Sequence, residues 1–181
     1  VTQMESSIKK TSEASASVVM SDSLQSQQLE AAFGSFANLF QSNSYAEVSL
    51  ENEKLVLVFA PKGAQILSLR LKEFSNYKEE PLYLIKENQS FNYSFTTTDG
   101  RELNSSDFYF TPKITERSGN QIVTLTAAVS ASQYIVFEYQ INADNYMIDF
   151  SIRSEGMRRL INTNEQQQIT WDLKAFRNSR S

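Results

Sequence analysis

The spacing of hydrophobic residues changes once along this chain, close to residue 45. Before that point, between residues 24 and 40, apolar residues recur at intervals of three and four, which places them on one face of a helix. We therefore expect a short helical segment over residues 24–44, although Gly34 weakens its middle. The residues expected to share the apolar face are Leu29, Ala32, Phe33, Phe36 and Phe40.

After residue 45 the period becomes two, which is typical of β-strands that bury one side. Near the end of the chain, for example, Trp171 stands between Ile169 and Leu173 on one apolar face. The turn sequences Ser118-Gly119-Asn120 and Asn142-Ala143-Asp144-Asn145 predict hairpins between consecutive strands. In chain order, the expected strands are Ala46–Leu50, Lys54–Ala60, Gln65–Lys72, Leu82–Ile85, Phe91–Thr97, Asp107–Glu116, Gln121–Val129, Gln133–Ile141, Tyr146–Arg153 and Ile169–Leu173.

This order of elements predicts an all-β fold. No helical crossover separates the strands, so neighbouring strands are expected to pair antiparallel in two sheets packed face to face. Residues 1–23 are rich in Ser and Thr and lack apolar periodicity, which is typical of a flexible linker. The predicted organisation is thus a linker over 1–23, the helical segment, a β-sandwich domain over 45–177 and a tail over 178–181.

The amino-acid composition excludes several kinds of functional site and partner. The sequence contains no cysteine and no histidine, which excludes disulfides, thiolate metal sites, thiol catalysis and the commonest general base. The net charge of −4 gives no basic footprint for a nucleic-acid partner. The longest run without a polar residue, residues 55–60, is far shorter than the roughly 18 residues of a membrane span. We predict no catalytic, cofactor-binding or metal-binding residue.

The remaining candidate motifs are better explained as structure. Ser75 and Lys78 have the spacing of a Ser-Lys pair, but they lie in a connection between strands. The adjacent acids Glu79 and Glu80 are expected in a solvated turn, and Asp144 in a hairpin turn without the other ligands of a calcium loop. An aromatic set is more simply core than a ligand-binding groove: Phe91, Tyr93, Phe95, Phe108, Tyr109 and Phe110. The C-terminal cations are interpreted first as a solvated cluster and second as a lipid-headgroup contact: Arg158, Arg159, Lys174, Arg177 and Arg180.

Two blocks of the sequence resemble the YidC-type membrane protein insertases, in the form found in Bacteroidetes-like bacteria. The first block runs from Leu50 to Phe74 and is followed by Tyr77-Lys78-Glu79-Glu80-Pro81-Leu82, which is similar to the family's Y-x-x-x-P-L segment. Within it, Lys62-Gly63-Ala64 has Ala64 where a second glycine is usual. The second block, Ile169–Arg177, is similar to the family's exit from its large periplasmic domain.

The resemblance implies a β-supersandwich similar to the sugar-mutarotase fold but without its activity. It also implies a parent protein with one membrane helix before Val1 and several after Ser181, so that this domain lies on the periplasmic side of the bacterial inner membrane. The expected role is non-catalytic contact with translocon components such as SecDF and with nascent membrane proteins, through residues that the sequence does not identify. Two alternatives stay open: a carbohydrate-binding mutarotase-like β-sandwich, and a secreted adhesion or scaffold module.

Overall fold

A computed structural model describes residues 23–42 and 44–177. The chain divides into two compact units, one that ends at Asn38 and one that begins at Leu39. The linker expected over residues 1–23 lies outside the described residues except for Ser23, and the tail over 178–181 lies outside them entirely.

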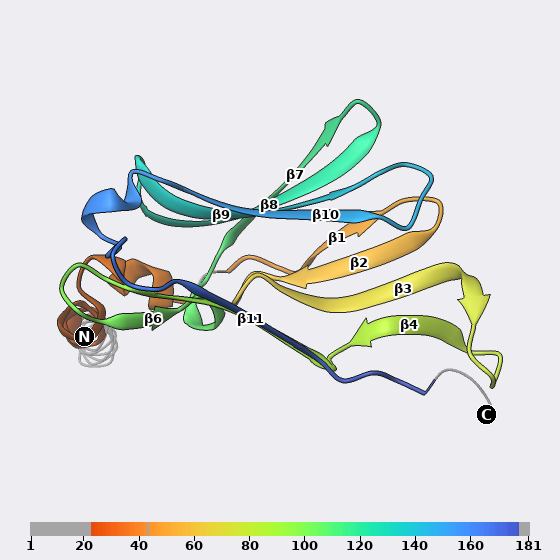
Figure 1. The fold of residues 1–181 in the computed structure, drawn as a ribbon, viewed down its shortest axis with the longest axis horizontal. Helices are drawn as coiled ribbons and strands as arrows, with labels where there is room; N and C mark the ends of the chain where they lie inside the picture. Colours follow the sequence, from red (N-terminus) through yellow and green to blue (C-terminus); the bar gives the residue numbers. More distant parts are fainter. Residues whose placement is uncertain (1–22, 43, 178–181) are drawn as a thin grey trace, which may run out of the picture. The chain divides into compact units, whose positions relative to one another are not determined.

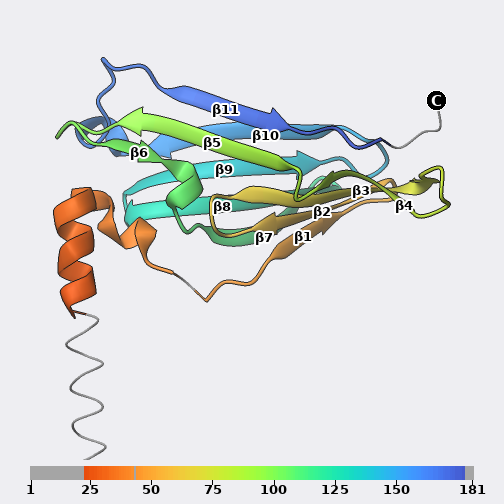
Figure 2. The same cartoon turned by 90° about the horizontal axis from the view of Figure 1, so that it is seen from below.

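The helical segment is broken at Gly34. An α-helix covers residues 23–33, and the 3-10 helix η1 (Gly34–Phe40) follows it directly (Figure 2). Gly34 has a φ of 56°, the left-handed conformation that commonly ends an α-helix. Because this residue and the tighter 3-10 turns change the angle between successive side chains, the single apolar face expected over residues 24–40 is not continuous.

The second unit consists of antiparallel strands, which confirms the all-β prediction (Figure 1). One sheet has the order β1-β2-β3-β4, from β1 (Val48–Glu51), β2 (Leu55–Ala60), β3 (Gln65–Ser75) and β4 (Pro81–Lys86). A second has the order β10-β9-β8-β7, from β7 (Thr111–Arg117), β8 (Asn120–Ser130), β9 (Gln133–Ile141) and β10 (Ile148–Glu155). A third has the order β11-β5-β6, from β5 (Gln89–Thr96), β6 (Glu102–Asn104) and β11 (Gln168–Leu173).

The core lies between the β7–β10 sheet and the other two sheets. The ring of Phe137 on β9 lies 5.7 Å from that of Phe91 on β5 and 5.0 Å from that of Phe110. On the same strand, Tyr139 contacts Phe59 of β2 at 4.8 Å. Each large apolar side chain buried in this way contributes about 1.5–3 kcal/mol. The aromatic set is therefore core, as predicted: Phe91, Tyr93, Phe95, Phe108 and Phe110 are buried and Tyr109 is half-buried.

The layer opposite β7–β10 is divided, where the sequence predicted one continuous sheet. The division falls between β3 and β5, and the side chain of Gln65 bridges it. Its Oε1 accepts a hydrogen bond from the backbone N–H of Phe91 at 2.9 Å, and its Nε2 donates to the carbonyl of the same residue. The amide group thus replaces a neighbouring strand for one residue of β5.

The hairpins at residues 118–119 and 142–147 form as predicted, but other boundaries differ. The strand expected from Asp107 begins only at Thr111, because the 3-10 helix η2 (Ser105–Asp107) occupies its start. The short strand β6 was not predicted, and a further 3-10 helix, η3 (Met157–Arg159), follows β10. Ala64, where the resemblance leads us to expect glycine, is buried and has a φ of 50°.

Candidate functional site

Apolar faces that the sequence predicted to be buried are exposed on strands β10 and β11. The exposed fraction is 60% for Trp171, 58% for Ile169 and 49% for Leu173 on β11, and 39% for Phe150 on β10. The prediction that every strand buries one side is therefore wrong for these strands. The reason is that no layer of the described chain fully covers these faces, and an alternating pattern cannot show whether a covering layer is present. Both strands are also edge strands of their sheets.

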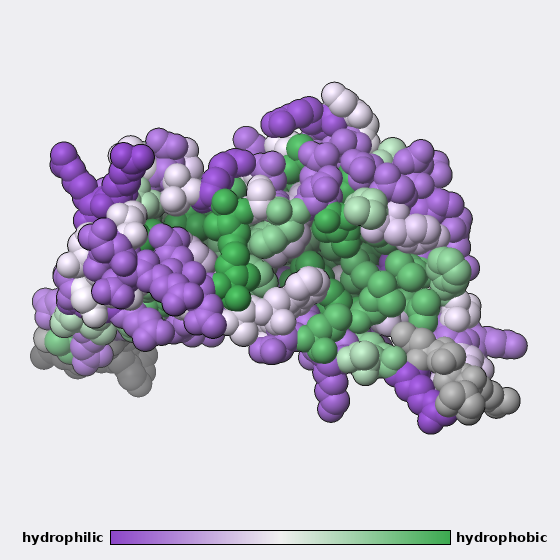
Figure 3. Space-filling view, viewed as in Figure 1, coloured by the Kyte–Doolittle hydropathy of each residue, from purple (hydrophilic) through white to green (hydrophobic). Residues whose placement is uncertain are grey.

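Three of these side chains, Phe150, Trp171 and Leu173, line a groove with a volume of about 260 Å³. Figure 3 shows hydrophobic residues gathered on this face between more polar surroundings. The groove runs between the open flank of the β7–β10 sheet and the divided layer opposite it. Its apolar walls come from six strands: Ile66 and Leu69 of β3, Leu84 and Ile85 of β4, Phe91 of β5, Tyr139 of β9, Ile148 and Phe150 of β10, and Trp171 and Leu173 of β11.

Gln89 supplies a polar group to the lining. Its Nε2 donates to the carbonyl of Ile66 at 2.8 Å, and its Oε1 accepts a hydrogen bond from Nε1 of Trp171 at 3.0 Å. The amide therefore fixes the indole ring at the groove and connects β5, β3 and β11. With its polar group paired to Gln89, Trp171 presents an apolar ring to any occupant.

The opposite wall is a cluster of aromatic rings around Phe150. This ring stacks on Tyr139 at 4.5 Å and meets Phe91 edge to face at 5.4 Å. Burial raises the pKa of the Tyr139 hydroxyl, so that group is neutral at any physiological pH. Phe150 is thus held firmly by its neighbours while 39% of it stays exposed.

A polar cluster joins the two layers at the β9–β10 hairpin. Tyr146 donates from its hydroxyl to Glu73 of β3 at 2.7 Å, and the Lys54 ammonium donates to the other oxygen of the same carboxylate at 2.6 Å. These two hydrogen bonds lower the pKa of Glu73 and raise the pKa values of its partners. Close by, the amide of Asn52 donates to the carbonyls of Asn142 and Asn145 at 2.6 and 2.9 Å. These hydrogen bonds, which we call the clamp, hold the β9–β10 hairpin against the start of β2 and the end of β3.

The candidate motifs of the sequence lie in turns and at strand ends of the described chain. Ser75 ends β3, whereas the ammonium of Lys78 lies over the ring of Tyr77 at 5.6 Å. Glu79 lies in a turn with a φ of 65°, and Asp144 lies in the β9–β10 turn, as predicted. Within residues 23–42 and 44–177, no three His, Cys, Asp or Glu residues gather as a metal site would require.

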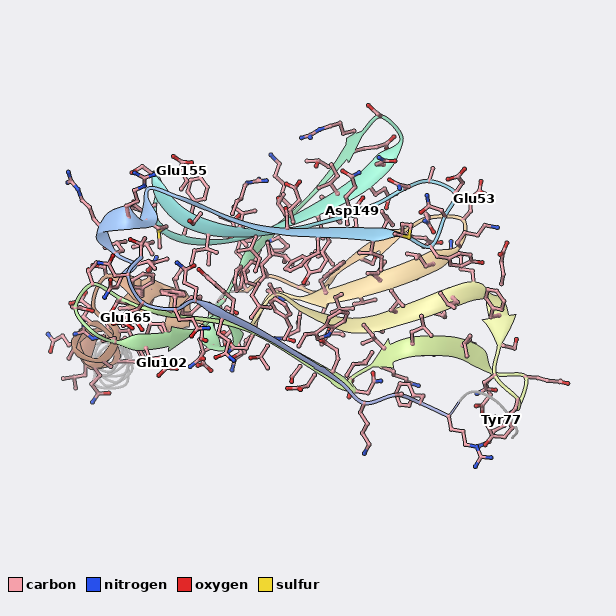
Figure 4. The ribbon with its side chains drawn as sticks, viewed as in Figure 1. Glu53, Tyr77, Glu102, Asp149, Glu155 and Glu165 are labelled. Carbon is pink, nitrogen blue, oxygen red and sulfur yellow. The ribbon has the colours of Figure 1, made fainter. Side chains whose placement is uncertain are left out.

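The C-terminal cations do not form one cluster. Arg158 and Arg159 lie in η3, while Lys174 and Arg177 follow β11 at the opposite end of the strands (Figures 1 and 4). Arg180 lies outside the described residues.

Sequence reasoning also missed the groove, although the exposed apolar alternation of β11 is the signal that points to it.

Comparison with known proteins decides the family. The model of the YidC periplasmic domain matches residues 47–181 of this chain. The chain belongs to the YidC periplasmic domain family. Relatives named membrane protein insertase YidC include one from Parabacteroides distasonis, 32% identical over 77% of this chain, and one from Azobacteroides pseudotrichonymphae, 34% identical over 70% of it. A third, from Porphyromonas gingivalis, is 28% identical over 75% of the chain.

The match covers a limited part of each relative. The aligned part of this YidC-family chain spans 22%, 21% and 21% of these relatives, about a fifth of their length. No solved structure matches the chain significantly. Of the helices in the described residues, none has the length and apolar character to cross a membrane.

Proposed function

We propose that this chain is a non-catalytic periplasmic domain of a membrane protein insertase, and that it acts by binding other proteins. Membership of the YidC periplasmic domain family supports the location on the periplasmic side of the inner membrane. The absence of His and Cys from the sequence supports a role without catalysis. The exposed groove between β10 and β11 is the single observation that carries a binding role.

The occupant that fits this groove is an extended apolar segment of a membrane protein before its insertion. Large side chains of the groove that are 39–60% exposed, such as Leu84, Phe150 and Trp171, would be covered by such a segment. Covering them removes apolar area from water at about 25 cal/mol per Å². Both β10 and β11 are edge strands, so the backbone of an extended occupant can also hydrogen-bond to the domain.

Contact with translocon components such as SecDF is the second part of the proposal. It rests on the resemblance of the sequence to the insertase family, and it is compatible with a domain whose groove serves a different partner. The two kinds of partner are separable because a translocon subunit has a fixed size on a gel, whereas nascent membrane proteins vary with the client that is translated.

Site-specific photo-cross-linking in the full-length parent protein tests the proposal. A photoreactive phenylalanine analogue replaces Trp171 or Leu84 in the groove, and Ile114 in the control. Ile114 is 48% exposed on β7 and does not line the groove. We expect nascent membrane proteins to cross-link from the two groove positions and not from Ile114. Equal cross-linking from all three positions, or failure of the parent to restore growth after insertase depletion, would contradict it.

A carbohydrate ligand is the second candidate, because Trp171 offers an exposed ring of the kind on which sugars stack. The chemistry of the groove favours it less. Sugars need several hydrogen-bond partners, whereas the lining is mostly aliphatic and aromatic, and the amide of Gln89 is already bonded to Trp171 and to β3. Calorimetry with a panel of glycans would distinguish the candidates, since measurable heat at the groove would favour the sugar.

A further inference from the structure

A second cavity lies at the start of β4, close to the segment that follows β11. Its volume is about 560 Å³, and the turn before β4 forms much of its wall. Tyr77, labelled in Figure 4, marks this end of the molecule. Three cations and three aromatic rings line the cavity: Lys78, Lys86, Arg177, Tyr77, Tyr83 and Phe176. We propose that this cavity binds the phosphate headgroup of an anionic phospholipid at a membrane surface.

Asn76 gives this cavity a fixed wall. Its side-chain oxygen accepts hydrogen bonds from the backbone N–H groups of Lys78 and Glu80, at 2.9 and 3.1 Å. Its own backbone N–H donates to the carbonyl of Glu80 at 2.9 Å, and its carbonyl accepts from the N–H of Glu79 at 3.0 Å. The turn that carries Tyr77 and Lys78 is therefore held in one conformation before any ligand arrives, which lowers the entropic cost of binding.

The charge of the lining suits an anion. Among its lining residues the cavity has three cations and one carboxylate, that of Glu80, and this carboxylate already accepts a hydrogen bond from the Asn76 amide at 2.9 Å. The four ion pairs of the described chain are Lys54–Glu73, Lys72–Glu51, Arg101–Asp99 and Arg153–Glu138. Neither lysine of the cavity belongs to them, so both ammonium groups are available to a phosphate. Lysine binds phosphate as a compact point charge.

The aromatic rings favour a lipid as the source of that phosphate. Lys78 lies 5.6 Å from the centre of the Tyr77 ring, and Lys86 lies 5.1 Å from that of Tyr83. Tyr77 and Phe176 are themselves 41% and 43% exposed. Exposed rings next to lysines are typical of protein surfaces at the level of lipid headgroups, where a ring meets acyl chains and an ammonium meets phosphate. A free phosphate in solution would gain nothing from the rings.

Vesicle binding by the 181-residue chain tests the proposal. Cosedimentation is measured with vesicles of pure phosphatidylcholine and with vesicles enriched in phosphatidylglycerol. The variant K78Q/K86Q/R177Q removes the three cations of the cavity. A matched control, K113Q/R117Q/R158Q, removes three exposed cations from β7 and η3. Circular dichroism verifies that both variants are folded.

We expect binding to phosphatidylglycerol vesicles and not to phosphatidylcholine vesicles. The cavity variant should lose affinity on the order of a hundredfold, at about fivefold for each cation near an anionic surface. The control variant should lose much less. Equal losses in both variants would overturn the proposal, because binding would then follow the overall charge of the chain. So would binding that does not depend on phosphatidylglycerol.

An NMR titration with inorganic phosphate separates the two sources of the anion. We expect no saturable shift at Lys78 and Lys86 with phosphate alone, because the rings then contribute nothing. Saturable binding of phosphate at these residues without binding to vesicles would overturn the assignment to a lipid and leave a site for a small phosphate compound.

Discussion

At the scale of single residues, two glycines with the same backbone conformation have different surroundings. Gly156 and Gly119 have φ values of 65° and 80°, a region that L-residues rarely adopt. A Cβ at Gly156 would lie 2.1 Å from the carbonyl oxygen of Ser132, whereas a Cβ at Gly119 would meet no atom within 4 Å. Glycine is therefore required at position 156 by both its backbone conformation and the lack of space for a Cβ, and at position 119 by its backbone conformation alone. Ala64 shows that this fold tolerates one buried non-glycine residue at positive φ.

Substitution by alanine should separate these two effects. We expect Gly119→Ala to lower the free energy of unfolding by about 1 kcal/mol, the cost of the left-handed conformation, and Gly156→Ala to lower it by about 3 kcal/mol because the backbone of Ser132 must also move. Urea denaturation of each variant measures the difference. Similar losses of unfolding free energy in both variants would mean that the contact between a Cβ at position 156 and the Ser132 backbone does not destabilise the fold.

At the scale of elements, local patterns predicted the strands but not what covers them. The apolar run of β2 and the pattern of β9 correctly predicted strands that contribute to the core, since both strands carry fully buried side chains. The alternation in β11 predicted burial that does not occur, since a pattern shows that a face is apolar and not whether a layer lies opposite. Strand β6 has three residues, too few to show a period. The division between β3 and β5 depends on Gln65 and Phe91, 26 positions apart, so no local window contains it.

The clamp between β3 and the β9–β10 hairpin should depend on pH. In the folded state the pKa of Glu73 is lowered mainly by the hydrogen bond from Lys54 and to a smaller extent by the hydrogen bond from Tyr146. A lowered folded-state pKa means that the stabilisation is present above the unfolded pKa of about 4.5 and is lost as the pH falls through the folded value. We expect Glu73→Gln to lower the urea midpoint at neutral pH and to make little difference in strong acid.

Glu116→Gln is the matched control for this prediction. It removes one carboxylate from β7, outside the four ion pairs of the described chain. Its urea midpoint should follow that of the unmodified protein at both pH values. A gap between Glu73→Gln and the unmodified protein that persists in strong acid would contradict the role of the carboxylate.

At the scale of the whole molecule, the unit from Leu39 onwards has an aromatic core with a groove at its side. Phe137 is fully buried and contacts the rings of Phe91 on β5, Phe150 on β10 and Phe110 just before β7. Trp171 lies at the groove and is more than half exposed. Stability and the proposed binding therefore involve different aromatic residues, and substitution can separate them.

Paired alanine substitutions should show this separation. We expect Phe137→Ala to lower the free energy of unfolding by about 3–5 kcal/mol, the usual cost of a cavity left by a buried ring. Trp171→Ala should lower it by less than about 1 kcal/mol, while it weakens cross-linking of nascent membrane proteins from position 84 in the parent protein. Differential scanning calorimetry measures the first effect. A large loss of stability in Trp171→Ala would show that this ring belongs to the core.

Trp171 is the only tryptophan in the sequence, and it stands at the mouth of the groove. The tryptophan fluorescence of this protein, excited selectively over its tyrosines, therefore comes from one position. An indole that is 60% exposed should emit at long wavelength in the native state, so unfolding will change the spectrum little and will pass almost unseen in a fluorescence assay. An apolar guest in the groove will do the opposite, shifting the emission to the blue while the fold stays the same. The emission wavelength of Trp171 should therefore report whether the groove is occupied, without any added label.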